Sequence, residues 1–261
     1  MRRIQAIAWN TFREAVRNKI LYSLLFFALL IILSALAMGN LTLHEEVRMT
    51  RDIGLFGIDA FGVIIAIFVG VNLLYKELDL KTVYTILPKP LNRWEFVLGK
   101  WLGMLLTLAV QMGVMGLVLA VTLWMQGAVF DIPTVKAVWL LFINVMLVTS
   151  IAVFFSAFSS PFLSGFFALG CFIVGRSVPD IRALAAKSGP LAKTLLDTGC
   201  TLIPNMHLFY PSGAIVGSDQ VSVHREFVNA SYLLSTTVYG VAYSLVVLLL
   251  AMLIFRKRDF V

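Results

Sequence analysis

The residues of this chain that could carry out chemistry are few and widely separated. Its three histidines are His44, His207 and His224, and none of them falls in an apolar run long enough to cross a membrane. They lack the neighbouring cysteines or carboxylates of a metal site, so we expect solvated or capping histidines and no bound metal. Cys171 lies in an apolar run and Cys200 in a polar segment, so no disulfide is expected between them.

Asp59 is the one carboxylate inside a long apolar run. A carboxylate in a membrane span is costly and is often functional, but its place near the outer end of the run would also let water reach it. Both a role in transport and a solvated position therefore remain open. Three amides lie at membrane depth, Asn72, Gln111 and Asn144, and such groups either bond neighbouring helices together or line a pathway.

The composition identifies an integral membrane protein. Of the 261 residues, 60% are hydrophobic and only 13% are charged, whereas a soluble domain carries about 25% charged residues. The formal net charge is +7, and in a membrane protein such an excess is first a signal of orientation. No nucleic-acid partner is expected.

Six apolar runs predict an all-α polytopic fold that forms a single transmembrane domain over residues 1–261. Residues 1–19 have apolar positions at helical spacing and several basic residues, which indicates an amphipathic helix in the membrane interface. The expected spans are 20–38, 53–75, 96–124, 137–158, 162–178 and 232–255. A long segment, 176–231, separates the last two spans and is expected to hold two short amphipathic helices on either side of Ser188-Gly189-Pro190.

Lysine and arginine predict the orientation of these spans. Thirteen of the 21 lie in three short segments: Arg2, Arg3, Arg13, Arg17 and Lys19; Lys76, Lys81, Lys89, Arg93 and Lys100; Arg256, Lys257 and Arg258. Basic residues in short segments favour the cytoplasmic side. We therefore expect a protein of the cell inner membrane with both termini in the cytoplasm and residues 176–231 outside it.

Two features mark the beginning of the third span. Lys100 lies near the end of the apolar run, where its stem can extend along the membrane and place the ammonium group at the surface. Gly99 and Gly103 form a Gly-x-x-x-Gly pair, which permits a neighbouring helix to approach closely. We expect that contact within one protomer.

A polar segment, Tyr75–Glu95, lies between the second and third spans. It contains a short stretch without glycine or proline whose apolar residues recur at the spacing of one helix face: Leu80, Val83, Tyr84 and Leu87. Pro88 and Pro90 end this helix, because the residue before a proline disfavours the helical conformation. Its apolar face could lie on the bilayer or dock in a groove of another protein.

The order of residues around this segment resembles the ABC-2-type permease pattern. The matching stretches are Glu77-x-Asp79-x-Lys81-Thr82, Leu87-x-x-Pro90-x-Asn92-Arg93, Leu98-Gly99-Lys100 and, before the last span, Leu202-Ile203-Pro204-Asn205-Met206-His207-Leu208-Phe209. Lys81 stands where the family has glycine, Asp79 replaces a glutamate and Asn92 a serine. The basic lead-in is similar to the branch that includes the permease of the nitrous-oxide-reductase maturation transporter.

The resemblance implies a transporter subunit, an exporter, that works as a dimer of identical protomers in contact with membrane lipids and two copies of a cytoplasmic ABC ATPase. The coupling helix and its flanks would comprise Glu77, Asp79, Lys81, Thr82, Val83, Tyr84, Leu87, Pro88, Pro90 and Arg93. No Gly-x-x-x-x-Gly-Lys-Ser/Thr loop occurs, so this chain is expected to bind no cofactor and not to be an enzyme, with ATP and Mg on the partner.

Two other functions remain as alternatives. A secondary transporter usually carries more ionisable residues in its spans or a visible repeat. An intramembrane enzyme would need a nucleophile beside a base, or paired carboxylates, within the spans. The sequence shows none of these features.

Overall fold

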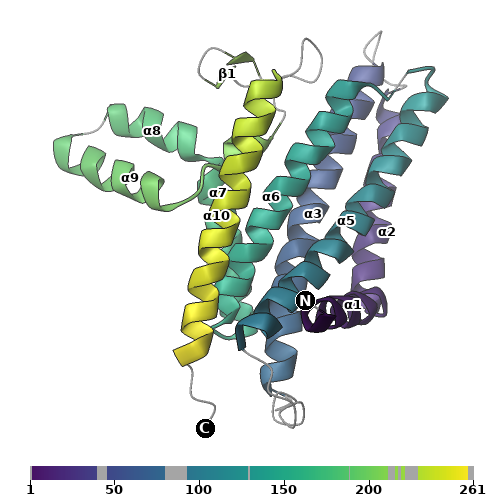
Figure 1. Ribbon diagram of the computed structural model, residues 1–261. Coiled ribbons are helices and arrows are strands. Elements are labelled where there is room, and N and C mark those ends of the chain that lie inside the picture. The colour runs from purple at the N-terminus through teal and green to yellow at the C-terminus, as the bar shows by residue number, and fades with distance from the viewer. Residues whose placement is uncertain are drawn as a thin grey trace.

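The computed structural model describes residues 2–39, 46–79, 93–128, 130–187, 189–210, 215–216, 219–220 and 229–257. The expectation of an all-α membrane protein is confirmed (Figure 1). The helices are α1 (Arg2–Val16), α2 (Lys19–Gly39), α3 (Glu46–Asp79), α5 (Arg93–Met125), α6 (Ile132–Ser156), α7 (Pro161–Arg176), α8 (Val178–Ala186), α9 (Pro190–Leu202), the 3-10 helix η1 (Met206–Phe209) and α10 (Ala230–Lys257). The expected helix around 80–87 lies outside the described residues.

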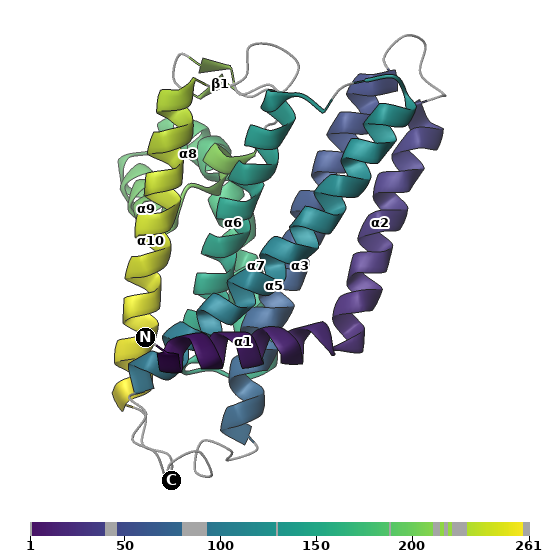
Figure 2. The same cartoon turned by 45° about the vertical axis from the view of Figure 1, so that its right-hand side comes forward.

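Five long helices, α2, α3, α5, α6 and α10, run side by side as a bundle, while α1 lies across one end of it (Figures 1 and 2). The start of α1 and the end of α10 lie at this same end of the bundle (Figure 2). The helices α8 and α9 pack against each other and project sideways as a hairpin (Figure 1). The amphipathic helix expected at the N-terminus is thus α1.

The number of spans depends on how α7 and α8 are counted. Among the described residues, five helices are long and apolar enough to cross a membrane. The pair α7 and α8 passes the same test only together and is bent by 59°, so the count is six if the pair forms one broken span. α3 has 34 residues and is about 50 Å long at 1.5 Å per residue, which exceeds the bilayer core of about 30 Å. α3 therefore extends beyond the expected span at both ends.

Prolines determine where the helices after α5 begin. Each of α6, α7, α8 and α9 has a proline at its first or second position, where the missing N–H would have no partner in the helix anyway. The same chemistry explains the bend after α7, because Pro179 cannot donate to the carbonyl of Gly175 and continue the helix.

The core of the molecule surrounds α6, which packs against α3, α5, α7 and α10. Close approach at two glycines permits this packing. A Cβ on Gly70 of α3 would lie 2.7 Å from the Cβ of Ala152, and one on Gly240 of α10 would lie 2.3 Å from the Cγ2 of Ile143. The outer faces of α2 and α10 instead expose large apolar side chains, as expected for surfaces in lipid.

A short antiparallel ladder lies between η1 and α10. Strand β1 (Ile215–Val216) pairs with β2 (Asp219–Gln220), each strand having two residues. The ladder precedes α10 and leaves the all-α class unchanged (Figure 1).

Candidate functional site

The docking of α1 on α5 depends on the Gly99–Gly103 pair. A Cβ on Gly99 would lie 2.8 Å from the Cβ of Ile7, and a Cβ on Gly103 would lie 2.5 Å from the carbonyl oxygen of Ala8 and 2.6 Å from the Cβ of Thr11. Only glycine allows the backbone of α1 to come this close. The close contact expected within one protomer is therefore confirmed, and the helix that uses it is α1.

Lys100, between these two glycines, is held by α1. Its side chain is 3% exposed, and its Nζ lies 3.9 Å from a carboxylate oxygen of Glu14 and 5.7 Å from the centre of the Phe96 ring. The expectation that Lys100 extends to the surface is wrong. Because α1 covers the start of α5, the ammonium group is compensated by a carboxylate instead of by water.

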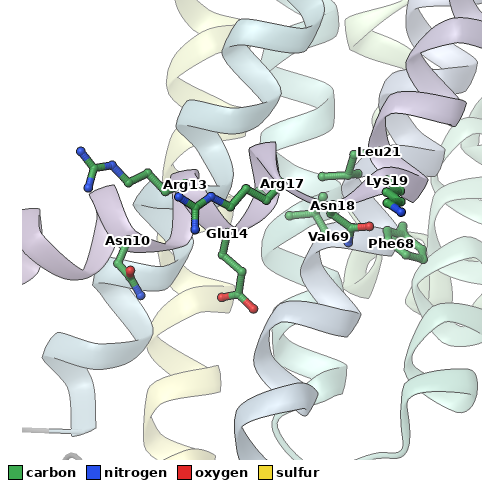
Figure 3. Close-up of a pocket in the computed structure, with 10 residues that line it drawn as sticks. Asn10, Arg13, Glu14, Arg17, Asn18, Lys19, Leu21, Phe68 and Val69 are labelled. Atoms are coloured by element: carbon green, nitrogen blue, oxygen red, sulfur yellow. The ribbon is translucent and has the colours of Figure 1, made fainter.

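A pocket of about 760 Å³ opens where α1 turns into α2 (Figure 3). The side chain of Asn18 caps α2, because its Oδ1 accepts a hydrogen bond from the backbone N–H of Ile20 at 3.0 Å. Residues of α1, α2, α3 and the turn line this pocket: Asn10, Arg13, Glu14, Ala15, Arg17, Asn18, Lys19, Leu21, Phe68 and Val69. It combines a basic rim with an apolar floor.

A second polar cluster lies inside the bundle around Asp59, in the N-terminal half of α3. Asn144 of α6 donates from Nδ2 to one carboxylate oxygen of Asp59 at 3.0 Å, and Arg176 at the end of α7 donates to the other. The guanidinium group of Arg176 lies 3.7 Å from the centre of the Tyr210 ring. The cluster thus connects α3, α6 and α7 to the segment that follows η1.

The interpretation that water solvates the Asp59 side chain is wrong. Its residue is only 3% exposed, and its side chain is paired with Arg176, which is 27% exposed. A buried ion pair is tolerated when each charge is matched and hydrogen-bonded. Arg176 lies where the fifth span and the segment 176–231 meet, and the structure shows that it contacts both Asp59 inside the bundle and Tyr210 of that segment.

The two described amides at membrane depth have different surroundings. Asn144 is part of the Asp59 cluster, whereas Gln111 of α5 is nine-tenths buried and its Oε1 has no hydrogen-bond partner among the described residues. Within the same residues, no group of three or more His, Cys, Asp or Glu side chains could hold a metal ion. Asn144 therefore bonds α6 to α3 through Asp59, whereas no such bond is seen at the Oε1 of Gln111 among the described residues.

The comparison with known proteins assigns the family. Residues 5–260 match the family model described as ABC-2 family transporter protein, which is nearly the whole chain. The chain belongs to the ABC-2 transporter family. Its matched region includes both polar clusters and the segment between α3 and α5. No curated protein matches the chain.

Membership makes the chain an ABC transporter permease, the multi-pass membrane subunit that goes with an ABC ATPase subunit. The match concerns the family and does not single out the nitrous-oxide-reductase branch. Of the residues expected in the coupling segment of this permease, Glu77 and Asp79 lie in the last turns of α3, and Arg93 is the first residue of α5. Asn72 also lies in α3. The remaining ones are outside the described residues: Lys81, Thr82, Val83, Tyr84, Leu87, Pro88 and Pro90.

Sequence reasoning missed two ion-pair partners in the permease, Glu14 and Arg176. Each had a signal. Glu14 is the one carboxylate in residues 1–19, and Arg176 is a cation at the end of one span when another span holds the single intramembrane carboxylate. Matching opposite charges at similar depth would have suggested both pairs.

Proposed function

We propose that this permease is the membrane half of an ATP-driven exporter and that ATPase movement enters it through the segment between α3 and α5. The observation that carries the proposal is that this segment connects two long helices, one of which is in close contact with α1. α3 leads into it at Asp79, α5 leaves it at Arg93, and α1 is locked to the first turns of α5 through Gly99, Lys100 and Gly103. A force on the segment would therefore move three helices as one body.

The energy source in this proposal is a separate chain. The closest approach to a phosphate-binding glycine loop is Gly165 to Gly170, but Cys171 follows and all three lie in α7. We infer that ATP and Mg bind to two copies of a cytoplasmic ABC ATPase and that the permease itself catalyses no hydrolysis. A helix at Lys81–Leu87 would then supply the contact with each copy, as expected from its apolar face.

The proposed orientation places both termini of the permease in the cytoplasm of a cell inner membrane. The bias of lysine and arginine supports it, as does the position of α1 and the end of α10 at one end of the bundle (Figure 2). Two ATPase copies call for two coupling segments, and hence for a second protomer, which we propose is identical. The apolar outer faces of α2 and α10 would then meet lipid or that protomer.

Co-purification tests the proposal. The full chain would be tagged, extracted from its own cells in mild detergent and affinity-purified, and the accompanying proteins identified by mass spectrometry. We expect an ABC ATPase in a one-to-one ratio with the permease, with ATP hydrolysis in the purified complex. A preparation that transports substrate in vesicles with no nucleotide-binding subunit present would overturn the proposal and favour a secondary transporter.

A further inference from the structure

The pocket at the turn between α1 and α2 carries more positive than negative charge. Three of its lining side chains are cationic, Arg13, Arg17 and Lys19, and one is a carboxylate, Glu14 (Figure 3). All three cations are exposed. The carboxylate of Glu14 lies 3.9 Å from the ammonium group of the buried Lys100, which partly neutralises the negative charge of Glu14. The rim of the pocket is therefore an attractive place for an anion.

None of these three cations forms an ion pair with another residue in the part of the chain that the structure describes. Arg13 has an aromatic contact, since its guanidinium carbon lies 5.4 Å from the centre of the Trp9 ring. Trp9 is about half exposed on the same helix. A tryptophan beside basic residues on a helix that lies across the bundle end is typical of a membrane interface at headgroup depth.

The floor of the pocket is apolar and leads into a groove. Leu21 and Val69 are buried beneath the basic rim, and Phe68 lines both the pocket and a second hollow of about 520 Å³ between α3 and α7. Apolar side chains and one glycine line this groove: Ile64, Ile67, Val71, Pro161, Phe162, Gly165, Phe166 and Leu169. Phe68 thus lies between the cationic pocket and the apolar groove.

We propose that the pocket and the groove together bind one anionic phospholipid of the leaflet that contacts α1. The phosphate of the headgroup lies against Arg17 and Lys19, and an acyl chain passes Phe68 into the groove between α3 and α7. Arg13 points away from Lys19 and Phe68 and adds its charge at the edge of the rim (Figure 3). A soluble anion would use the rim and leave the groove without an occupant. A zwitterionic lipid would use the groove but gain less from the rim.

The site lies where α1, α2 and α3 meet, so a bound lipid contacts all three helices. Its headgroup would hold the turn at Asn18, and its chain would extend along α3 towards α7. Because α1 is also locked to α5, occupation of the site would stiffen the helices next to the segment between α3 and α5. This inference does not depend on the identity of the ATPase or of the transported substrate.

Native mass spectrometry of the detergent-purified full chain tests the site. The probes are phosphatidylglycerol and phosphatidylcholine with identical acyl chains. We expect phosphatidylglycerol to be retained at higher collision energy than phosphatidylcholine. The double variant Arg17→Gln/Lys19→Gln should lower the retained phosphatidylglycerol by about tenfold or more, because each basic residue adds to the attraction of an anionic lipid. Retention of phosphatidylcholine should fall by much less, because its choline already offsets the phosphate charge.

Arg182→Gln is the matched control, since Arg182 is an exposed cation on α8 and lies outside the pocket. This variant should behave as the unmodified chain. Equal retention of the two lipids, or undiminished phosphatidylglycerol binding in the double variant, would overturn the proposal and favour a protein partner for the cations. Displacement of the lipid by excess inorganic phosphate would show a simple phosphate site and would overturn it as well.

A second variant tests the groove. A Cβ on Gly165 would meet only the Cγ2 of Ile67 at 3.7 Å, an ordinary contact, so Gly165→Leu fills the groove without a clash at the backbone. We expect this variant to lose retention of both lipids while keeping its circular dichroism spectrum. If Gly165→Leu retains both lipids as the unmodified chain does, the acyl chain does not lie between α3 and α7.

Discussion

Gly103 lies directly against the backbone carbonyl of Ala8, so close that a Cβ on Gly103 would come within 2.5 Å of that oxygen. The contact explains why a glycine recurs after Leu98-Gly99-Lys100 at the start of α5. α1 is not a loose anchor on the membrane surface, because its backbone is in van der Waals contact with α5 and its Glu14 compensates the buried Lys100. The interfacial helix is a structural part of the helix bundle.

The first prediction concerns this contact. Gly103→Ala should lower the free energy of unfolding by about 1–3 kcal/mol, because the added methyl group must push α1 away from α5. Gly113→Ala is the matched control on the same helix, since a Cβ there would meet nothing within 4 Å. The control should be neutral or stabilised by up to about 1 kcal/mol, since alanine favours the helix. Thermal unfolding in detergent measures both, and equal effects would contradict the close contact.

The second prediction concerns the pair of Asp59 and Arg176. Arg176→Gln leaves the buried carboxylate without its cation and should cost about 3 kcal/mol. Asp59→Asn leaves Arg176 without its carboxylate, but the Arg176 side chain is 27% exposed and water can reach it. The loss of stability in Asp59→Asn should therefore be smaller than in Arg176→Gln. The double variant should be more stable than the sum of the single effects by about 1–3 kcal/mol. Melting temperatures of the four proteins give the comparison, and additive effects would mean that the two residues do not interact.

The third prediction compares that pair with a more exposed one. Arg51 of α3 donates to both carboxylate oxygens of Asp131 at 3.1 Å, but the Asp131 side chain is 42% exposed. Arg51→Gln leaves this exposed carboxylate without its cation, and water can solvate it, so the variant should cost less than about 1 kcal/mol. The melting temperature should fall less than in Arg176→Gln, measured in the same detergent. A larger fall in Arg51→Gln would show that the exposure of the remaining carboxylate does not decide the cost of breaking these two ion pairs.

The fourth prediction tests the proposed coupling helix. Tyr84→Ala and Leu87→Asp each remove apolar surface from the helix face expected to contact the ATPase, so ATP hydrolysis should continue while transport falls. Thr85→Ala is the control, because Thr85 falls on another face of the same expected helix. ATPase activity and uptake into inverted vesicles would be measured on the same preparation, with membrane insertion checked by fractionation. Transport that stays coupled in both variants would remove this helix from the mechanism.

Much of the fold could be predicted because the signals are local. The apolar runs predict the long helices, and the prolines at 133, 161, 179 and 190 mark the beginnings of α6 to α9. The amphipathic character of residues 1–19 predicts α1. The length of α3 was less predictable, since it extends beyond the expected span 53–75 at both ends, whereas α5 agrees with its expected span 96–124 to within three residues at each end.

The environment of each charged residue was harder to predict than its helix. Lys100 was expected to reach the surface, and a solvated position was one of two possibilities for Asp59, yet both residues are 3% exposed. Their partners, Glu14 and Arg176, are 86 and 117 residues away in the chain. No helical period or propensity connects residues at that distance, so the pairs follow only from the way the helices pack.

The sequence alone determined the class of this protein, because the balance of apolar and charged residues depends only on composition and the order of motifs only on the chain. It also determined which stretches are long and apolar enough to cross a membrane. Tertiary structure decided which charges are buried, which glycines allow contact and which cations share a pocket. These properties arise because helix packing brings distant side chains together: α1 against α5 buries Lys100, and α7 against α3 joins Arg176 to Asp59.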